Sequence, residues 1–489
     1  MAEAVTADVP ARDRGTTVIR SAALSMVGLV ALGLTRLVHG ALVARATDKP
    51  TYAVVGTLIG LAMTVSLIVP GGLASAAARY ISFHTGGRDP AAARAAYRVL
   101  TIAGFVSAAV LAALVAGIAL QLDGVTTGDV VAVAALTAVY SAYSVAKGSL
   151  YGYDRLIPYT WLEVAGSVVA IGATVVVVTV GAHAYLLPLV IGNSVLMLGS
   201  YVVLRRRRRL EATEPPTETR PLNLRDLAVW VGLASLGGGA SAGLLQALPV
   251  IAGRFTSQVN VAYFVAAVTL VAPLVFLPRA VGLALFPFMA RAHGAGDVDA
   301  VRRHADVSTR ALLTLLAPIF AVGILLSPEV LAVYGGGQYS EGAPVLRLLL
   351  LATYAGAIQV AAVNSLSSGD AVRIPVYSAV AGAGVGLVAL IPLGHYLGAV
   401  GVGLAYLVAV GITSAVPLRA TWRRYQMAWR GPVLRSSAVV LAALAAGEAL
   451  STAGPARTAL DVLAAAAAVG GAALLLRTDV RYVLAARHG

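Results

Sequence analysis

A charged residue inside an apolar segment is the first candidate for chemistry in this chain. Arg36 lies in the stretch 17–44, about two helical turns before its end. A guanidinium binds the oxygens of a phosphate group through two parallel hydrogen bonds. Because an arginine that faces lipid is costly, it usually faces a cavity or a partner. We therefore expect Arg36 to line a cavity for an anionic group. The alternative is that its side chain extends to the lipid headgroups.

Other polar residues within or beside apolar segments extend this candidate site. Gln246 lies near the equivalent point of a later segment, and Arg45 and Arg254 stand at matching segment ends. For the two end arginines the alternative role is anchoring at the membrane surface, and for the amides it is hydrogen bonding between helices. The candidate cavity residues are Arg36, Gln246, Arg254, Arg45, Asn193, Gln359 and Asn364.

Two similar loops, about 209 residues apart, indicate a duplicated unit. Each has Gly-Leu-Ala, beginning at Gly72 or Gly282, followed by arginine, histidine, glycine and aspartate. The candidate gate residues are the pairs Arg79/Asp89 and Arg291/Asp297. One interpretation is a salt bridge that forms when a gate closes. The other is that these residues set topology and cap helices.

The composition excludes several classes of protein. With 59% hydrophobic residues, 12% charged residues and a mean hydropathy of +0.84, the chain has too few polar residues to cover the surface of a soluble protein. The net charge of +14 does not indicate nucleic-acid binding, because most basic residues lie between apolar segments. The chain has no cysteine, which excludes disulfides and thiolate metal sites. We expect no metal and no cofactor.

Helices that cross about 30 Å of hydrocarbon need roughly 20 apolar residues. By this criterion the sequence predicts an all-α, polytopic membrane protein with about 14 transmembrane helices. The predicted spans are 17–44, 52–80, 97–120, 129–147, 157–180, 185–204, 226–252, 260–289, 308–327, 344–366, 374–393, 399–420, 433–451 and 457–476.

Basic residues alternate between the two sets of loops and so predict orientation. One set holds almost all arginines, including the run 205–209, whereas the other holds only Arg45, Lys49, Arg254, Arg347 and Arg457. The arginine-rich side is expected to be cytoplasmic. The chain is then a multi-pass protein of the cytoplasmic membrane with both termini in the cytoplasm. The run 205–209 either contacts anionic lipids or anchors the topology.

Six spans separate the two similar loops, so both halves enter the membrane in the same direction. This predicts two six-helix bundles related by a pseudo-two-fold axis, with a cavity between them. The expected parts are a cytoplasmic tail (1–16), an N-terminal bundle (17–204), a basic linker (205–225), a C-terminal bundle (226–420), two additional helices (421–476) and a cytoplasmic tail (477–489).

Several short motifs resemble those of a known transporter group. The first runs from Leu34-Thr35-Arg36 to Val43-Ala44-Arg45, the second is Phe286-Pro287-Phe288-Met289 before Gly296-Asp297, and the third is Tyr334-Gly335-Gly336-Gly337-Gln338-Tyr339. Their order and spacing resemble polysaccharide flippases of the multidrug/oligosaccharidyl-lipid/polysaccharide (MOP) superfamily. The resemblance covers roughly residues 17 to 420.

The resemblance implies alternating access by two six-helix bundles. The implied cargo is a lipid-linked oligosaccharide or polysaccharide precursor on an anionic polyprenyl-phosphate carrier. Expected partners are this lipid-linked glycan, membrane lipids and glycan polymerases or glycosyltransferases of the same pathway, with no nucleic acid.

Two other functions stay open. One is a cation-coupled multidrug or metabolite antiporter of the same superfamily. The other is a membrane polymerase or glycosyltransferase that uses the lipid carrier. Because no phosphate-binding loop, nucleophile elbow or large soluble insertion occurs, we expect no catalytic residues and no enzyme.

Overall fold

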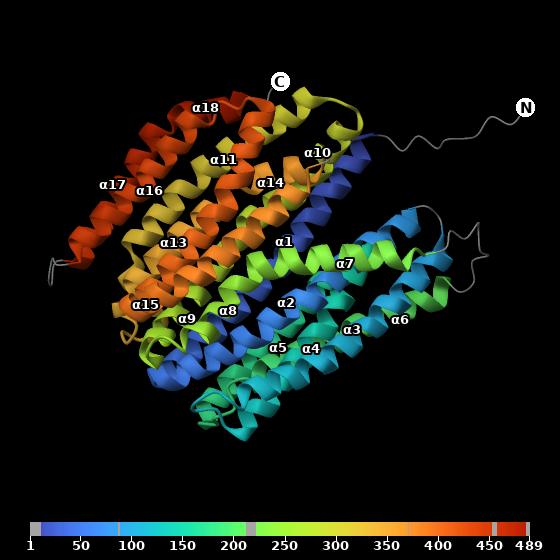
Figure 1. The fold of residues 1–489 in the computed structure, drawn as a ribbon, viewed down its shortest axis with the longest axis horizontal. Coiled ribbons are helices and arrows are strands. Elements are labelled where there is room, and N and C mark those ends of the chain that lie inside the picture. Colours follow the sequence, from blue (N-terminus) through green and yellow to red (C-terminus); the bar gives the residue numbers. More distant parts are fainter. Residues whose placement is uncertain (1–10, 87–88, 212–221, 370, 452–456, 486–489) are drawn as a thin grey trace, which may run out of the picture.

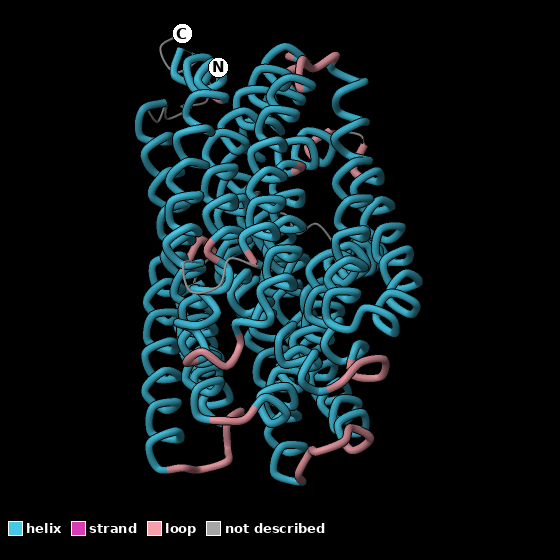
Figure 2. The backbone as a smooth tube through the Cα atoms, turned by 90° about the vertical axis from the view of Figure 1, so that its left-hand side faces the viewer, coloured by secondary structure: helices cyan, strands magenta, loops and turns pink. Residues whose placement is uncertain are grey.

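The computed structural model describes residues 11–86, 89–211, 222–369, 371–451 and 457–485. Within these ranges the regular elements are all helices, which confirms the predicted all-α fold (Figures 1 and 2). The first half contains α1 (Ala11–Ala46), α2 (Lys49–Gly86), α3 (Pro90–Ala119), α4 (Thr127–Gly152), α5 (Leu156–Val180) and α6 (Leu187–Glu211).

The second half has more interruptions than the first. It contains α7 (Leu224–Gly238), η1 (Gly239–Gly243), α8 (Leu244–Ala252), α9 (Gln258–Val271), η2 (Ala272–Val275), α10 (Phe276–Gly294), α11 (Val298–Leu325), α12 (Ser327–Gly335), η3 (Ser340–Gly342), α13 (Ala343–Ile358), α14 (Val360–Ser367) and α15 (Arg373–Tyr425). Three helices follow, which are α16 (Arg430–Leu450), α17 (Arg457–Leu475) and α18 (Arg477–Ala485).

The number of membrane crossings agrees with the predicted fourteen. Thirteen described helical segments are long and apolar enough to span a bilayer. The longest of them, α15, is two helices in one, because Gly398 has a φ of 57° and breaks the helical backbone. Only glycine adopts this conformation routinely. The break turns the chain so that α15 supplies two crossings.

Capping residues mark the start or the end of several of these helices. Thr126 and Asp129 form a reciprocal capping box at the start of α4. Ser257 caps α9 by accepting a hydrogen bond from the Asn260 backbone amide. Gly181 ends α5 in the left-handed conformation. The N-terminal caps satisfy backbone amides that the helical ladder leaves free, and the C-terminal cap satisfies carbonyls.

The helices gather into two groups whose ends diverge on one side (Figure 1). Helices α2 to α6 pack on one another, and α1 packs along α5. In the second group α13 packs against α9, α11 and α15. The side on which α6 ends and α7 begins is the one predicted to be cytoplasmic, and we call the opposite side the predicted outer side.

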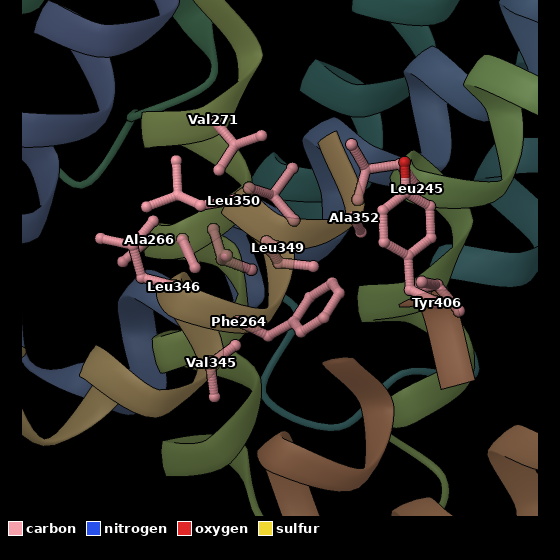
Figure 3. Close-up of a cluster of buried hydrophobic side chains, with 14 of the residues drawn as sticks. Leu245, Phe264, Ala266, Val271, Val345, Leu346, Leu349, Leu350, Ala352 and Tyr406 are labelled. Carbon is pink, nitrogen blue, oxygen red and sulfur yellow. The ribbon is translucent and has the colours of Figure 1, made fainter. Parts of the chain in front are cut away.

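The centre of the second half is a close-packed apolar core. Phe264 and Val271 of α9 lie beside Leu346, Leu349 and Leu350 of α13 (Figure 3). The Phe264 side chain is 1% exposed, and Leu349 is fully buried. Such packing fixes the helices that surround the site described below.

Ion pairs attach α16 and α18 to the rest of the second half. Asp479 of α18 is 1% exposed and accepts from Arg310 and Arg435, each at 2.7 Å. Arg347, expected in an outer loop, lies instead in α13 with 1% exposure. It donates to Glu448 of α16 at 2.9 Å and to the Ile324 carbonyl at 3.2 Å. These partners offset part of the free-energy cost of burying the Arg347 charge, and they join α16 to the second half.

Candidate functional site

A small cavity lies between the two halves, at the level where α1, α2, α8 and α9 meet. Its free volume is about 50 Å³. The residues that line it come from both halves, as expected for a site that the two halves form together. They are Arg36, His39, Gly40, Val43, Tyr52, Val55, Gly56, Ile59, Gly60, Leu189, Gln246, Pro249, Val265, Val268, Thr269 and Ala272.

The structure places two predicted cavity residues, Arg36 and Gln246, in this lining. Arg36 comes from α1 of the first half and Gln246 from α8 of the second. Arg36 stands ten residues before the end of α1, about 15 Å along the helix axis. Its Nη2 atom is buried and has no hydrogen-bond partner among the described residues. An unpaired buried guanidinium nitrogen is costly unless a ligand or water uses it.

The electrostatic character of the cavity is positive. Among the described residues that line it, Arg36 is the only one with a fixed charge, and no aspartate or glutamate is present. The other polar groups are the hydroxyls of Tyr52 and Thr269, the amide of Gln246 and the imidazole of His39. This set of groups suits an anion with several oxygen atoms better than a cation.

His39 is a lining residue that sequence reasoning missed. It is 2% exposed, and its Nδ1 lies 2.9 Å from the Thr174 hydroxyl of α5. Its Nε2 atom has no partner among the described residues. The available signal was spacing, because positions 36 and 39 share one face of a helix.

The halves are joined on the predicted outer side of the cavity. Arg45 donates to the Tyr334 carbonyl at 3.1 Å and also to the Val333 carbonyl. Lys49 donates to the Tyr263 hydroxyl at 2.8 Å and lies 3.8 Å from the Glu341 carboxylate. We call Arg45, Lys49, Val333, Tyr334 and Glu341 the outer clasp.

A buried tyrosine pair links the outer clasp, through Tyr334, to the cavity lining, through Tyr52. The Tyr52 and Tyr334 hydroxyls lie 2.6 Å apart. Burial raises the pKa of Tyr334 well above its ordinary value, so its hydroxyl stays neutral. Gly56 lets α2 approach α9 just below, since a Cβ there would lie 2.1 Å from Cγ1 of Val265. The cavity is therefore shut toward the predicted outer side.

The opposite ends of the two halves are separated. In Figure 1, α10 and α14 lie at the top, whereas α3, α6 and α7 extend to the right. Between the halves, α7 packs along α2, and α10 also contacts α1. Arg79 stacks on Trp230 of α7, with its guanidinium carbon 3.7 Å from the ring centre, and the Trp230 indole donates to Ser75 at 3.4 Å.

The remaining candidate cavity residues lie elsewhere. Arg254 is exposed in the turn after α8. Asn193 donates to the Leu189 carbonyl at 2.7 Å and Asn364 to the Val360 carbonyl at 2.8 Å, each one turn back in its own helix. Gln359 stands at the junction of α13 and α14. The structure does not bring these four into the lining described above.

The two loop aspartates have the same local role. Asp89 accepts from the Ala92 amide at 2.9 Å and caps α3. Asp297 accepts from the Ala300 amide at 2.8 Å and caps α11. The matching caps agree with the repeat seen in the sequence. Arg291 lies in α10, and its side chain falls outside the part that the structure describes.

A second polar group lies inside the first half. Glu163 of α5 is fully buried and accepts from Lys147 at 3.1 Å and from the Tyr143 hydroxyl. The Lys147 ammonium also lies 4.9 Å from the centre of the Tyr159 ring. The carboxylate is thus compensated by a cation of the same chain.

Comparisons with known proteins agree with this architecture. The MatE family model matches residues 243–391, which run from the end of η1 into α15. No curated protein matches the chain significantly in sequence.

Solved structures resemble the chain over most of its length. An inward-facing multidrug resistance MATE family transporter of the MOP superfamily is 14% identical, with a TM-score of 0.66 over 82% of this chain and 98% of that one. The lipid II flippase MurJ, in an inward closed conformation, is 11% identical, with a TM-score of 0.63 over 94% of this chain and 99% of that one.

A third structure is a MOP superfamily transporter from Pyrococcus furiosus, described as having a binding pocket of reverse polarity that suggests a different function. It is 16% identical, with a TM-score of 0.57 over 84% of this chain and 95% of that one. At such identities the likeness concerns the fold. The chain therefore has the fold of the multi-pass membrane transporters of the MOP superfamily.

Proposed function

We propose that this protein is a flippase that moves an anionic lipid-linked oligosaccharide or polysaccharide precursor across the cytoplasmic membrane by alternating access. The observation that carries the proposal is the acid-free lining around Arg36, described above. A phosphate-type headgroup needs a fixed positive charge when it enters a low-dielectric region. A transporter of organic cations would instead require acidic groups there.

The comparisons support the same choice of cargo. A lipid II flippase shares the fold over 94% of this chain. The relative from Pyrococcus furiosus links a change of pocket polarity to a change of function. We apply that reasoning here, because the described lining of this cavity holds an arginine and no acid.

The size of the cavity supports a cycle between two conformations. The space of about 50 Å³ that water can enter holds only a few water molecules. A sugar-phosphate headgroup is many times larger, so the halves must separate further before cargo reaches Arg36. The outer clasp holds the present state closed on the predicted outer side while the other ends stand apart. The proposed cycle opens these two sides in turn and includes no covalent step.

Transport of a defined lipid tests the proposal. The purified full chain would be reconstituted into vesicles that contain a fluorescent polyprenyl-pyrophosphate disaccharide, and movement between leaflets followed by quenching from outside. We expect exchange with the wild type and at least a tenfold loss with Arg36→Gln. We expect partial activity with Arg36→Lys, which keeps the charge without the two-pronged geometry.

Cells provide a second test. Depletion of the protein should leave a lipid-linked glycan accumulated in the inner leaflet. Normal glycan export combined with increased sensitivity to cationic drugs would instead identify an antiporter, and full exchange by Arg36→Gln would remove Arg36 from the site.

A further inference from the structure

The hydrogen-bond pattern around His39 fixes where its proton lies. Thr174 has one hydroxyl hydrogen, and its oxygen lies 2.8 Å from the Ala170 carbonyl and 2.9 Å from His39 Nδ1. A carbonyl can only accept. Both contacts are hydrogen bonds at once only if Thr174 donates to Ala170 and His39 Nδ1 donates to Thr174. In the neutral imidazole, Nε2 then carries a lone pair and no hydrogen.

The Nε2 lone pair would repel an anion that binds next to it. His39 lines the same cavity as Arg36, one helical turn away on α1. Its Nε2 is buried and, like Nη2 of Arg36, has no partner among the residues that the structure describes. An anionic oxygen that enters beside Arg36 is repelled by a bare Nε2 and attracted by a protonated one. Binding of the anion therefore favours addition of a proton to Nε2.

His39 is the residue whose charge we expect to change when an anion binds. Arg36 is a permanent cation and opposes protonation while the cavity holds no anion. The other groups around the cavity that bear on His39 are the Thr174 hydroxyl on α5, Thr269 on α9, and the Tyr52 and Tyr334 hydroxyls on α2 and α12. Among the described lining residues no carboxylate is available to hold a second positive charge in place.

We propose that His39 takes up one proton on Nε2 when an anionic headgroup binds beside Arg36 and releases it when the headgroup leaves. This inference rests on the proposed function and narrows its cargo. With His39 protonated, the cavity offers two positive charges, which match a diphosphate headgroup better than a monophosphate diester. Water or buffer supplies the proton, and no bond of the cargo changes.

Calorimetry on the purified full chain in detergent tests the inference. The probe is geranyl pyrophosphate at about pH 8, where its phosphate groups are ionised. Titrations in two buffers with different heats of ionisation report how many protons are taken up with each bound probe. We expect up to one proton for the wild type, and a Kd that rises by up to tenfold for each pH unit.

Two variants assign the proton to His39. In His39→Asn the side-chain amide can still donate to Thr174 but cannot titrate, and His39→Gln is a second neutral replacement. We expect both to bind the probe more weakly, with proton uptake near zero and a Kd that no longer depends on pH. Melting temperatures close to that of the wild type would show that both fold.

The outcomes separate the two proposals. Binding by the wild type without proton uptake, or with equal uptake in both His39 variants, overturns the role of His39 and leaves the anion site standing. If neither variant binds, the wild-type proton count decides. Failure of the wild type to bind, with Arg36→Gln no different, overturns the anion site and the His39 proposal with it.

Discussion

Arg45 at the end of α1 donates from Nε to the Tyr334 carbonyl of α12, 3.1 Å away, although 289 residues separate them. The last carbonyls of a helix lack intrahelical partners and carry a partial negative charge. The guanidinium satisfies two of them, Val333 and Tyr334, and so links the first half to the second. In a transporter that alternates between two states, this contact must break when the outer side opens.

A covalent link at the outer clasp should stop transport. The chain has no cysteine, so Lys49→Cys with Glu341→Cys introduces the only two thiols. In the wild type the Lys49 ammonium and the Glu341 carboxylate lie 3.8 Å apart. A short bifunctional thiosulfonate should join the thiols, and lipid exchange in vesicles should fall to background. A reducing agent should restore it.

Each single-cysteine variant treated with the same reagent is the control and should keep its activity. Undiminished exchange in the linked protein would show that the outer side does not open here.

The close approach of α2 and α9 at Gly56 should tolerate no added side chain. A Cβ at Gly56 would lie 2.1 Å from Cγ1 of Val265, so Gly56→Ala should cost about 1–3 kcal/mol of the closed state. We expect a lower melting temperature and a larger share of molecules with the Lys49 region accessible. Adding Val265→Gly should reverse both effects.

Gly117 is the matched control for this test, because a Cβ there meets nothing within 4 Å. Gly117→Ala should leave the melting temperature unchanged or slightly raised. Equal behaviour of the two alanine variants would argue against the contact at Gly56.

Substitution of Asp297 distinguishes a helix cap from a gate salt bridge. Its carboxylate accepts from the Ala300 amide. Asparagine caps a helix about as well as aspartate, whereas alanine costs about 1 kcal/mol. We expect Asp297→Asn to retain both stability and transport, and Asp297→Ala to lower the melting temperature. A stable Asp297→Asn protein without transport would show that the charge itself is needed for the gate.

The buried pair of Lys147 and Glu163 should behave as a unit. Lys147→Met leaves a fully buried carboxylate without its cation and should cost about 3–5 kcal/mol. Combining it with Glu163→Leu removes both charges and should recover most of that loss, as measured by thermal unfolding in detergent. A single Lys147→Met variant as stable as the wild type would contradict this account.

The same double variant also tests for coupling. If the pair is structural, the recovered protein should exchange lipid at a rate near that of the wild type. Loss of transport in a stable double variant would assign Glu163 a part in energy coupling.

The positions of the membrane helices follow from the sequence, because apolar runs of about 20 residues have few other stable environments. The predicted spans 97–120 and 157–180 correspond to α3 and α5. Helix ends were harder to predict. α1 begins at Ala11 and α6 continues to Glu211, past the predicted limits of 17 and 204. A helix can continue through polar residues beyond its apolar run, so hydropathy does not show where the helix ends.

The candidate site was partly predictable. Arg36 and Gln246 attract notice because each is a polar residue in an apolar segment, and both line the cavity. Asn193 and Asn364 gave the same signal, but each bonds a carbonyl of its own helix. Nothing in sequence hydropathy separates these outcomes, because they depend on which face of the helix is turned toward its neighbours.

By itself the sequence determined the helical class, the number of crossings, the internal repeat and the depth of Arg36, since these depend on local composition and spacing. Only the tertiary structure decided that Arg36, His39 and Gln246 meet, that Arg45 closes the end of α12, and that Arg347 is buried against Glu448. These contacts join residues up to 289 positions apart. They depend on how the helices rotate and pack against one another, which cannot be predicted from local composition and spacing.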